Sequence, residues 1–229
     1  MISMSVVLAV RTKDGVYMGG DSQITYGESK STLVSPNLYK VWNVDEHPNT
    51  IMGGVGALRD LNIASCMGEL YDPISDKLEE ELSFPKMVNE VVPGLFNHFT
   101  QHGRTLNDGG VISLRNSSFL IAQKDNCYLV DTDGCVMDLM EGECIAIGSG
   151  AVVAKAAYEA LDMSSDYTTE QKIAMALVRS CEQSAGVGFP IYIMNTMDET
   201  MLYMSQEDFF TPYEDEDEDI EAVEDNIED

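Results

Sequence analysis

Cysteine and histidine are the side chains of this sequence whose spacing could support metal or thiol chemistry. None of the five cysteines forms a Cys-x-x-Cys pair or another metal-ligand spacing. The cysteines are Cys66, Cys127, Cys135, Cys144 and Cys181. His98 and His102 lie four residues apart in a segment of helical periodicity, but no acidic motif of the HExxH type accompanies them. We therefore interpret the two histidines as part of a polar helix face, and we expect neither a metal nor a cofactor.

The charge of the chain excludes two classes of partner. The 229 residues include 13 Lys+Arg and 40 Asp+Glu, which gives a net charge of −27. Such a field repels phosphates and anionic lipid head groups, so we expect no nucleic acid and no membrane as partner. An odd number of cysteines without a signal peptide indicates reduced thiols, and the apolar run 6–10 is too short for a secretion signal or a membrane span. We expect a cytoplasmic protein.

The acidic excess is concentrated at the end of the chain. Residues 214–229 contain eleven acidic residues and no basic ones. A segment of this composition repels itself and buries too little apolar surface to fold, so the sequence predicts a disordered acidic tail over 212–229. It could bind a basic patch on a partner in a salt-dependent way. The folded part is then 5–211.

Hydrophobic periodicity and turn residues divide the folded part into strands and helices. Strands are expected over 5–11, 16–23, 39–44, 50–55, 111–114, 118–122, 127–131, 135–138, 143–147, 190–194 and 201–204. Helices are expected from about Leu58, over 84–101 with a kink at Pro93, over 151–161, and over 168–184 behind a Thr168-x-x-Gln171 capping box. The expected order of elements is strands, two helices, strands, two helices and strands, which indicates an α+β protein. The order is typical of a four-layer αββα sandwich, two antiparallel sheets between helical pairs.

Several short blocks of the sequence resemble those of a known family. The blocks are Ser5-Val6-Val7-Leu8-Ala9-Val10-Arg11, Gly20-Asp21-Ser22-Gln23-Ile24-Thr25, Lys40-Val41, Ile51-Met52-Gly53-Gly54-Val55-Gly56 and Ile145-Ala146-Ile147-Gly148-Ser149-Gly150. In this order they are similar to proteasome β-type subunits, most of all to the bacterial HslV kind, allowing for a short insertion at 28–36. The resemblance covers about 5–205 and implies an N-terminal nucleophile (Ntn) hydrolase that assembles into rings around a chamber.

The resemblance also implies a set of site residues. It matches Ser5 to the nucleophile, Asp21 and Lys40 to its charged partners, Gly53 to the oxyanion glycine, and Ser149 to a serine that relays the proton of the terminal amine. A hydroxyl is a weak nucleophile, and an α-amine with a pKa near ~8 can accept its proton only if the residue is the first of the chain. Residues 1–4 must then be removed, as a self-cleaved propeptide or through initiation at Met4 followed by loss of the methionine.

Several of these residues also have a purely structural interpretation. Asp21 could be a turn residue and Lys40 a surface lysine, Gly53 could form a strand-to-helix bend, and Ser149 could be a helix N-cap. Serine in place of threonine departs from the family pattern, since it loses the methyl that restricts the rotamer. The stretch 183–188 departs as well, with Gln183 and Gly186 where proteasome β-subunits carry an Asp and a Ser. We leave that stretch out of the predicted site.

The predicted function is that of a self-compartmentalised peptidase which hydrolyses peptide bonds with Ser5 as an N-terminal serine nucleophile. The expected partners are identical subunits in a ring, an AAA+ unfoldase and unfolded protein substrates. Two alternatives remain: a proteasome-like structural subunit that has lost activity, favoured by residues 1–4 and the departure at 183–188, and a small-molecule amidohydrolase on the same fold.

Overall fold

Two five-stranded antiparallel sheets form the centre of the molecule in the computed structural model, which describes residues 5–26, 29–33, 39–44, 47–66 and 81–210. The first sheet has the order β12-β1-β2-β13-β14, spanning Cys144–Gly148, Val6–Thr12, Gly15–Asp21, Ile191–Asn195 and Asp198–Met204. The second has the order β11-β10-β9-β6-β5, spanning Val136–Asp138, Asn126–Val130, Ser118–Gln123, Thr50–Val55 and Val41–Asn43.

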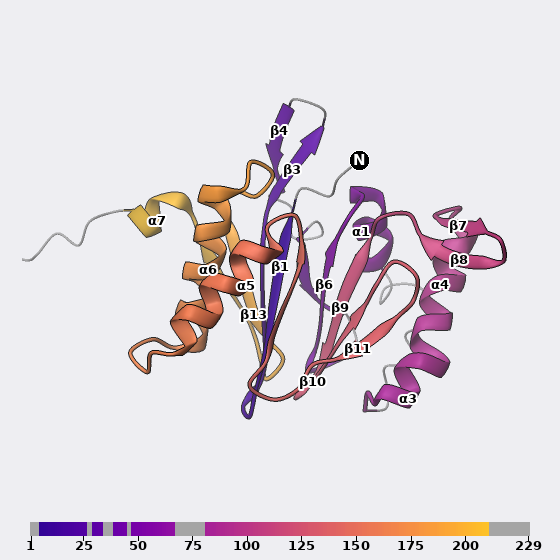
Figure 1. Cartoon of the computed structure of the whole chain (residues 1–229), viewed down its shortest axis with the longest axis horizontal. Helices are drawn as coiled ribbons and strands as arrows, with labels where there is room; N and C mark the ends of the chain where they lie inside the picture. The colour runs from indigo at the N-terminus through magenta and orange to yellow at the C-terminus, as the bar shows by residue number, and fades with distance from the viewer. Residues whose placement is uncertain (1–4, 27–28, 34–38, 45–46, 67–80, 211–229) are drawn as a thin grey trace, which may run out of the picture.

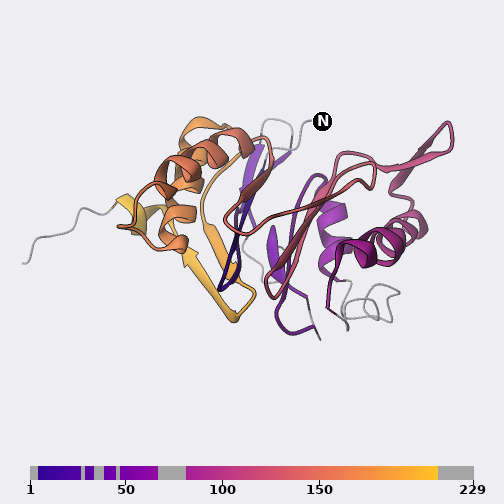
Figure 2. The same ribbon diagram turned by 60° about the horizontal axis from the view of Figure 1, so that its bottom comes forward.

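Helices cover the outer face of each sheet (Figure 1). Helices α5 (Ala151–Asp162) and α6 (Thr169–Gln183) pack on the first sheet, and α1 (Leu58–Ser65) and α4 (Val92–Gln101) pack on the second. Three clusters of buried side chains separate the four layers, and the turned view of Figure 2 shows both sheets lying between the helical pairs. The predicted αββα sandwich is confirmed.

Strand β1 shows why the sequence builds this centre. Its side chains alternate between two apolar clusters: Val6 and Leu8 face α5 and α6, whereas Val7 and Ala9 face the second sheet. Both faces are therefore buried, which explains a nearly unbroken apolar run in an antiparallel strand. The residue that precedes this strand, Ser5, is held at one end of the sheet.

The predicted helices are mostly confirmed, with one correction. The Thr168 capping box is present, and α6 follows it. The segment 84–101 divides into α3 (Phe84–Lys86), a π-helical turn η1 (Met87–Val91) and α4. Pro93 has no N–H to donate to the carbonyl of Asn89, and in place of a kink at Pro93 the helix has an irregular π-helical turn just before it.

Some elements were not expected from the sequence. They are the hairpin of β3 (Gln23–Tyr26) and β4 (Ser29–Thr32), strand β7 (Thr105–Asp108), which pairs with β8 (Val111–Leu114), and helix α7 (Gln206–Phe210). The predictions for residues 1–4, for 212–229 and for the continuation of the first helix at Met67 and Leu70 lie outside the described residues. Among the described helices, none combines the length and the apolar character needed to cross a membrane.

Candidate active site

Ser5 lies immediately before β1 and is fixed through its backbone. It is only 5% exposed. Its nitrogen donates a hydrogen bond to Ser149 Oγ at 3.2 Å, and its carbonyl oxygen accepts one from Gly150 N–H, also at 3.2 Å. The next residue, Val6, donates its N–H to Asp21 Oδ1 at 2.8 Å. The structure thus brings Ser5, Asp21 and Ser149 together from three distant parts of the sequence.

Asp21 and Lys40 form a buried ion pair beside Ser5. Lys40 Nζ donates to Asp21 Oδ1 at 2.7 Å and to the carbonyl oxygen of Gln23 at 2.6 Å. The two side chains are 0% and 1% exposed, respectively. Because Asp21 Oδ1 accepts both from Lys40 Nζ and from Val6 N–H, the ammonium is anchored one residue away from Ser5. The alternative of a turn aspartate and a surface lysine is wrong.

Burial shifts the ionisation of both partners. Burial lowers the pKa of Lys40, and the negative charge of Asp21 opposes that shift. Burial likewise raises the pKa of Asp21, against the opposing influence of Lys40 and of backbone N–H groups from Val6 and Gly188. Neither charge is stable in such a place without the other. A buried lysine whose pKa is lowered, anchored one residue from a candidate nucleophile, is typical of sites that activate a nucleophile.

Gly53 lies inside β6, opposite Val41, and a side chain there would collide with the core between the sheets. A Cβ at this position would lie 2.5 Å from Met18 Sδ and 2.8 Å from Val7 Cγ1. The strand-to-helix bend falls later, at Gly56, whose φ is +133°. The bend hypothesis for Gly53 is therefore wrong. Packing alone accounts for the glycine, and its oxyanion role stays a prediction from the resemblance.

The segment Gly148-Ser149-Gly150 wraps closely around Ser5. Gly148 has a φ of +97°, and a Cβ there would lie 2.2 Å from the carbonyl oxygen of Ser5. The N-cap of α5 is Gly150, with no side-chain cap, so the expected capping role of Ser149 is wrong. Its hydroxyl instead accepts the hydrogen bond from Ser5.

The structure adds two residues that sequence reasoning missed. Gln23 supplies a carbonyl oxygen to Lys40, and Gly188 donates its N–H to Asp21 Oδ2 at 3.2 Å. Gln23 also donates from Nε2 to the carbonyl of Ala185 at 3.0 Å. The stretch 183–188, left out of the predicted site, therefore contacts it through its backbone. No residue type signals a backbone contact, and the one available hint was its two glycines.

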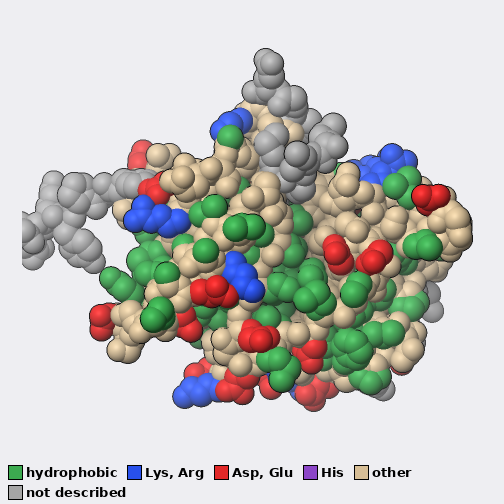
Figure 3. Space-filling view, in the orientation of Figure 1, with side chains coloured by type: hydrophobic (Ala, Val, Ile, Leu, Met, Phe, Trp, Pro, Cys, Tyr) green, Lys and Arg blue, Asp and Glu red, His purple; other side chains and the backbone are tan. Residues whose placement is uncertain are grey.

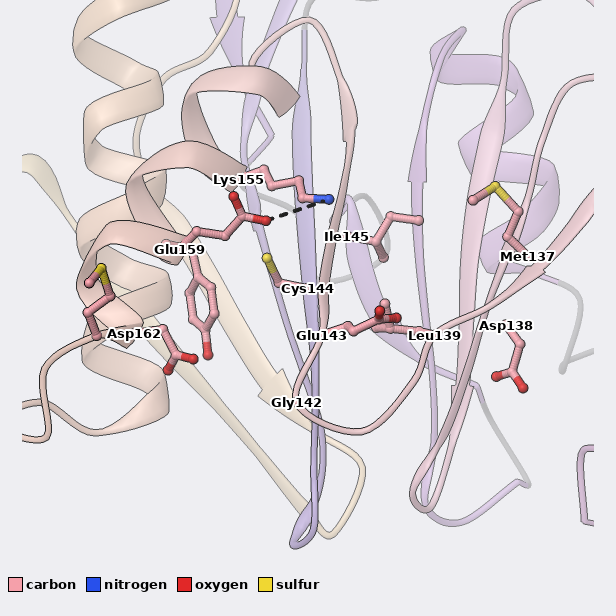
Figure 4. A pocket seen from close by; sticks show the side chains of 12 residues that line it. Met137, Asp138, Leu139, Gly142, Glu143, Cys144, Ile145, Lys155, Glu159 and Asp162 are labelled. Atoms are coloured by element: carbon pink, nitrogen blue, oxygen red, sulfur yellow. Dashed lines mark ion pairs between the residues drawn. The ribbon is translucent and has the colours of Figure 1, made fainter.

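A separate cleft of about 510 Å³ lies along α5, β12 and β11 (Figure 4). Lys155 and Glu159 of α5, which form an ion pair, line it together with Glu143 and Cys144. None of the five predicted site residues lines this cleft.

The molecule has four layers, and a buried Asp–Lys pair lies close to a serine at the start of β1. Together these features define the Ntn-hydrolase class of fold. The model of the proteasome subunit family matches residues 4–185, and the chain belongs to that family. It is 22% identical over 177 residues to the "ATP-dependent protease subunit HslV" of Campylobacter hominis, an alignment that covers 77% of this chain and 87% of that protein. The HslV subunit of Campylobacter concisus is also 22% identical over 177 residues, which cover 77% of this chain and 89% of that protein.

Solved structures show the same fold at low identity. BPH of Thiobacillus denitrificans, in complex with epoxomicin, superposes with a TM-score of 0.67 at 19% identity and covers 87% of this chain and 99% of that one. HslV of Trypanosoma brucei gives a TM-score of 0.58 at 22% identity, with 82% and 97% covered. Anbu of Yersinia bercovieri gives 0.65 at 15% identity, with 88% of each chain covered. The HslV-like resemblance read from the sequence is confirmed.

Proposed function

We propose that the protein is an HslV-like peptidase subunit whose nucleophile is Ser5, exposed as the first residue by removal of residues 1–4. One observation carries the proposal: the nitrogen of Ser5 lies against Ser149 Oγ while the Asp21–Lys40 pair is anchored one residue further on. These contacts support a role for Ser149 in proton relay and for the Lys40 ammonium in activating Ser5.

The uncut chain and the mature chain differ in the chemistry of a single atom. In the uncut chain the nitrogen of Ser5 is an amide, which donates to Ser149 and cannot act as a base. After cleavage it is an amine that can accept the proton of its own hydroxyl. Ser5 Oγ then attacks the substrate carbonyl carbon, the tetrahedral intermediate collapses to an acyl-enzyme, and the protonated amine returns its proton to the leaving amine. Water hydrolyses the ester by the same steps.

The surrounding groups have separate tasks in this scheme. The ammonium of Lys40 lowers the pKa of the hydroxyl and of the amine, while Asp21 holds the lysine in place. Ser149 passes protons to and from the amine. We assign the oxyanion donor to the N–H of Gly53 on the resemblance alone; one such donor contributes about 3 kcal/mol in comparable sites.

Substrate class and assembly follow from the relatives. The relatives that are named subunits of an ATP-dependent protease support a ring of identical chains. They also support an ATPase partner that delivers unfolded protein to this ring. The cytoplasmic location and the reduced cysteines of the sequence prediction agree with such a role.

Treatment of the purified protein with a peptide epoxyketone, followed by intact-mass measurement, tests the proposal. We expect a mature chain that begins at Ser5 and carries one inhibitor on that residue. An intact N-terminus without labelling favours the inactive structural subunit. Hydrolysis of small amides without cleavage of an unfolded protein favours the amidohydrolase.

A further inference from the structure

A group of arginines gathers at one end of this acidic protein. Arg104 Nε pairs with buried Asp60, which also accepts a hydrogen bond from Ser117 Oγ at 2.7 Å. Arg59 neighbours Asp60 in α1, and Arg115 lies two residues before Ser117. Asp60 binds Arg104 directly, Arg59 Nη2 donates to the carbonyl oxygen of His102 at 3.5 Å, and Arg115 lies on the segment that supplies Ser117. Figure 3 shows basic side chains at the upper right, beside the β7–β8 hairpin.

Two of these arginines have no acidic partner in the part of the chain that the structure describes. Asp60 neutralises Arg104, whereas Arg59 and Arg115 are exposed. Within the described residues, neither of the two has an acidic ion-pair partner. In a chain with three times as many acidic as basic residues, two exposed arginines that pair with no described carboxylate favour an anionic partner.

The adjoining β7–β8 hairpin presents two exposed apolar side chains beside those arginines, on a face that also carries Asp108 and Ser113. In its register Leu106 pairs with Ser113 and Asp108 with Val111, so Leu106 and Val111 share one face, opposite to that of buried Leu114. They are 43% and 60% exposed. The hairpin belongs to neither large sheet and projects from the body of the molecule (Figure 2). We name Arg59, Arg104, Arg115, Leu106 and Val111 the arginine corner.

The sequence contains a segment with the complementary composition. Residues 214–229 carry eleven acidic side chains, with Ile220, Val223 and Ile227 between them. Acidic groups match the arginines and branched apolar side chains match Leu106 and Val111. The last described helix, α7, lies at the opposite end of the molecule from the hairpin (Figure 1). A contact between opposite ends of two copies can repeat head to tail from copy to copy, and such a heterologous contact can close into a ring.

We propose that residues 214–229 of one copy bind the arginine corner of another copy. Two contributions stabilise this binding: the attraction between opposite charges, which salt weakens, and the burial of small apolar surfaces. The proposal needs a second copy but no peptidase activity, so it stands or falls separately from the assignment of Ser5.

Nuclear magnetic resonance of the full chain labelled with ¹⁵N tests this proposal through the amide signals of Ile220, Val223 and Ile227. At low salt we expect these signals to be at least threefold weaker than at about 0.5 M NaCl, because binding to a large body broadens them. Arg59→Glu/Arg115→Glu should restore them at low salt. Lys155→Glu/Arg179→Glu makes the same change of charge on α5 and α6 and should leave them weak.

Mixing two preparations then decides which copy is bound. When the labelled Arg59→Glu/Arg115→Glu chain is added to an excess of unlabelled parent chain, its signals should weaken again. If they stay strong, the segment binds its own copy and the proposal is wrong. It is equally wrong if the parent signals are already strong at low salt, or if both double variants restore them. Melting temperatures of the two variants within a few degrees of the parent exclude misfolding as the cause.

Discussion

At the level of single residues, Asp21 connects the parts of the candidate site. Its two carboxylate oxygens accept from Val6, Gln23 and Gly188 backbone N–H groups as well as from Lys40. Four segments therefore meet at one buried side chain. A carboxylate that accepts this many hydrogen bonds is costly to replace, because each donor would be left unsatisfied.

Ser5→Ala should abolish turnover of an unfolded substrate and labelling by an epoxyketone, because it removes the attacking oxygen and no packing. Ser5→Thr should preserve or raise turnover, since it restores the family's residue with its stiffer rotamer. The assembly mass of both variants should equal that of the parent. Digestion by Ser5→Ala at the parent rate, in a preparation free of host protease, would make Ser5 an ordinary strand residue.

Lys40→Met should lower turnover by orders of magnitude and reduce the free energy of unfolding by about 3–5 kcal/mol, since it leaves Asp21 charged and buried alone. The double variant Lys40→Met/Asp21→Asn removes both charges and should recover part of that stability but none of the activity. Denaturant unfolding and a peptide assay separate the two effects. Activity that returns together with stability would assign the pair a structural role only.

The pH dependence of labelling follows from the lowered pKa of Lys40. Its ammonium loses the proton at a pH below the ~10.4 of an ordinary lysine, and the positive charge beside Ser5 disappears with it. The labelling rate should therefore fall as pH rises through that lowered pKa. The guanidinium of Lys40→Arg keeps its charge at high pH. The remaining labelling rate of this variant should therefore not fall as the pH rises. The same fall in labelling rate at high pH in both proteins would contradict the role assigned to Lys40.

Sequence reasoning could predict the side chains of the site but not its backbone contributors. Ser5, Asp21, Lys40 and Ser149 were placed by resemblance, and the structure brings all four together. Gly188 was missed because it contributes an N–H, a group that every residue except proline possesses.

At the level of elements, apolar strands and capped helices could be predicted because their patterns are local. Strand β6 and the capping box of α6 lie where they were expected. The β3–β4 hairpin could not be predicted, because the side chains of β4 are all exposed and carry no alternating pattern. The position of the irregular turn before Pro93 depends on which carbonyl loses its donor, a detail that periodicity does not show.

The segment that encloses Ser5 offers a test with a matched control. Gly148→Ala and Gly142→Ala both place a side chain at positive φ, +97° and +82°, which costs about 1–2 kcal/mol. Only the first also meets Ser5, because nothing lies within 4 Å of a Cβ at Gly142. Gly142→Ala should therefore lose that stability and keep its activity, whereas Gly148→Ala should lose more stability and nearly all labelling of Ser5. Equal behaviour in both assays would contradict the close packing.

At the level of the whole molecule, the family relationship predicts assembly. We expect a homo-oligomer of at least six subunits at micromolar concentration, measured by native mass spectrometry. Detection of monomer alone under these conditions would contradict the proposed ring, and with it the enclosed chamber.

The geometry around Asp21 also bears on when the protein can become reactive. The groups that surround Ser5 come from β2, the segment before β5, the loop after β12 and the loop before β13, so they span nearly the whole described chain. Contacts between residues so far apart in sequence form late, after most of the chain has collapsed. A nascent chain on the ribosome that ends before Gly188 cannot complete the donor set of Asp21. Under the proposal that Ser5 is the nucleophile, its surroundings are complete only once the chain has been synthesised past Gly188 and has folded.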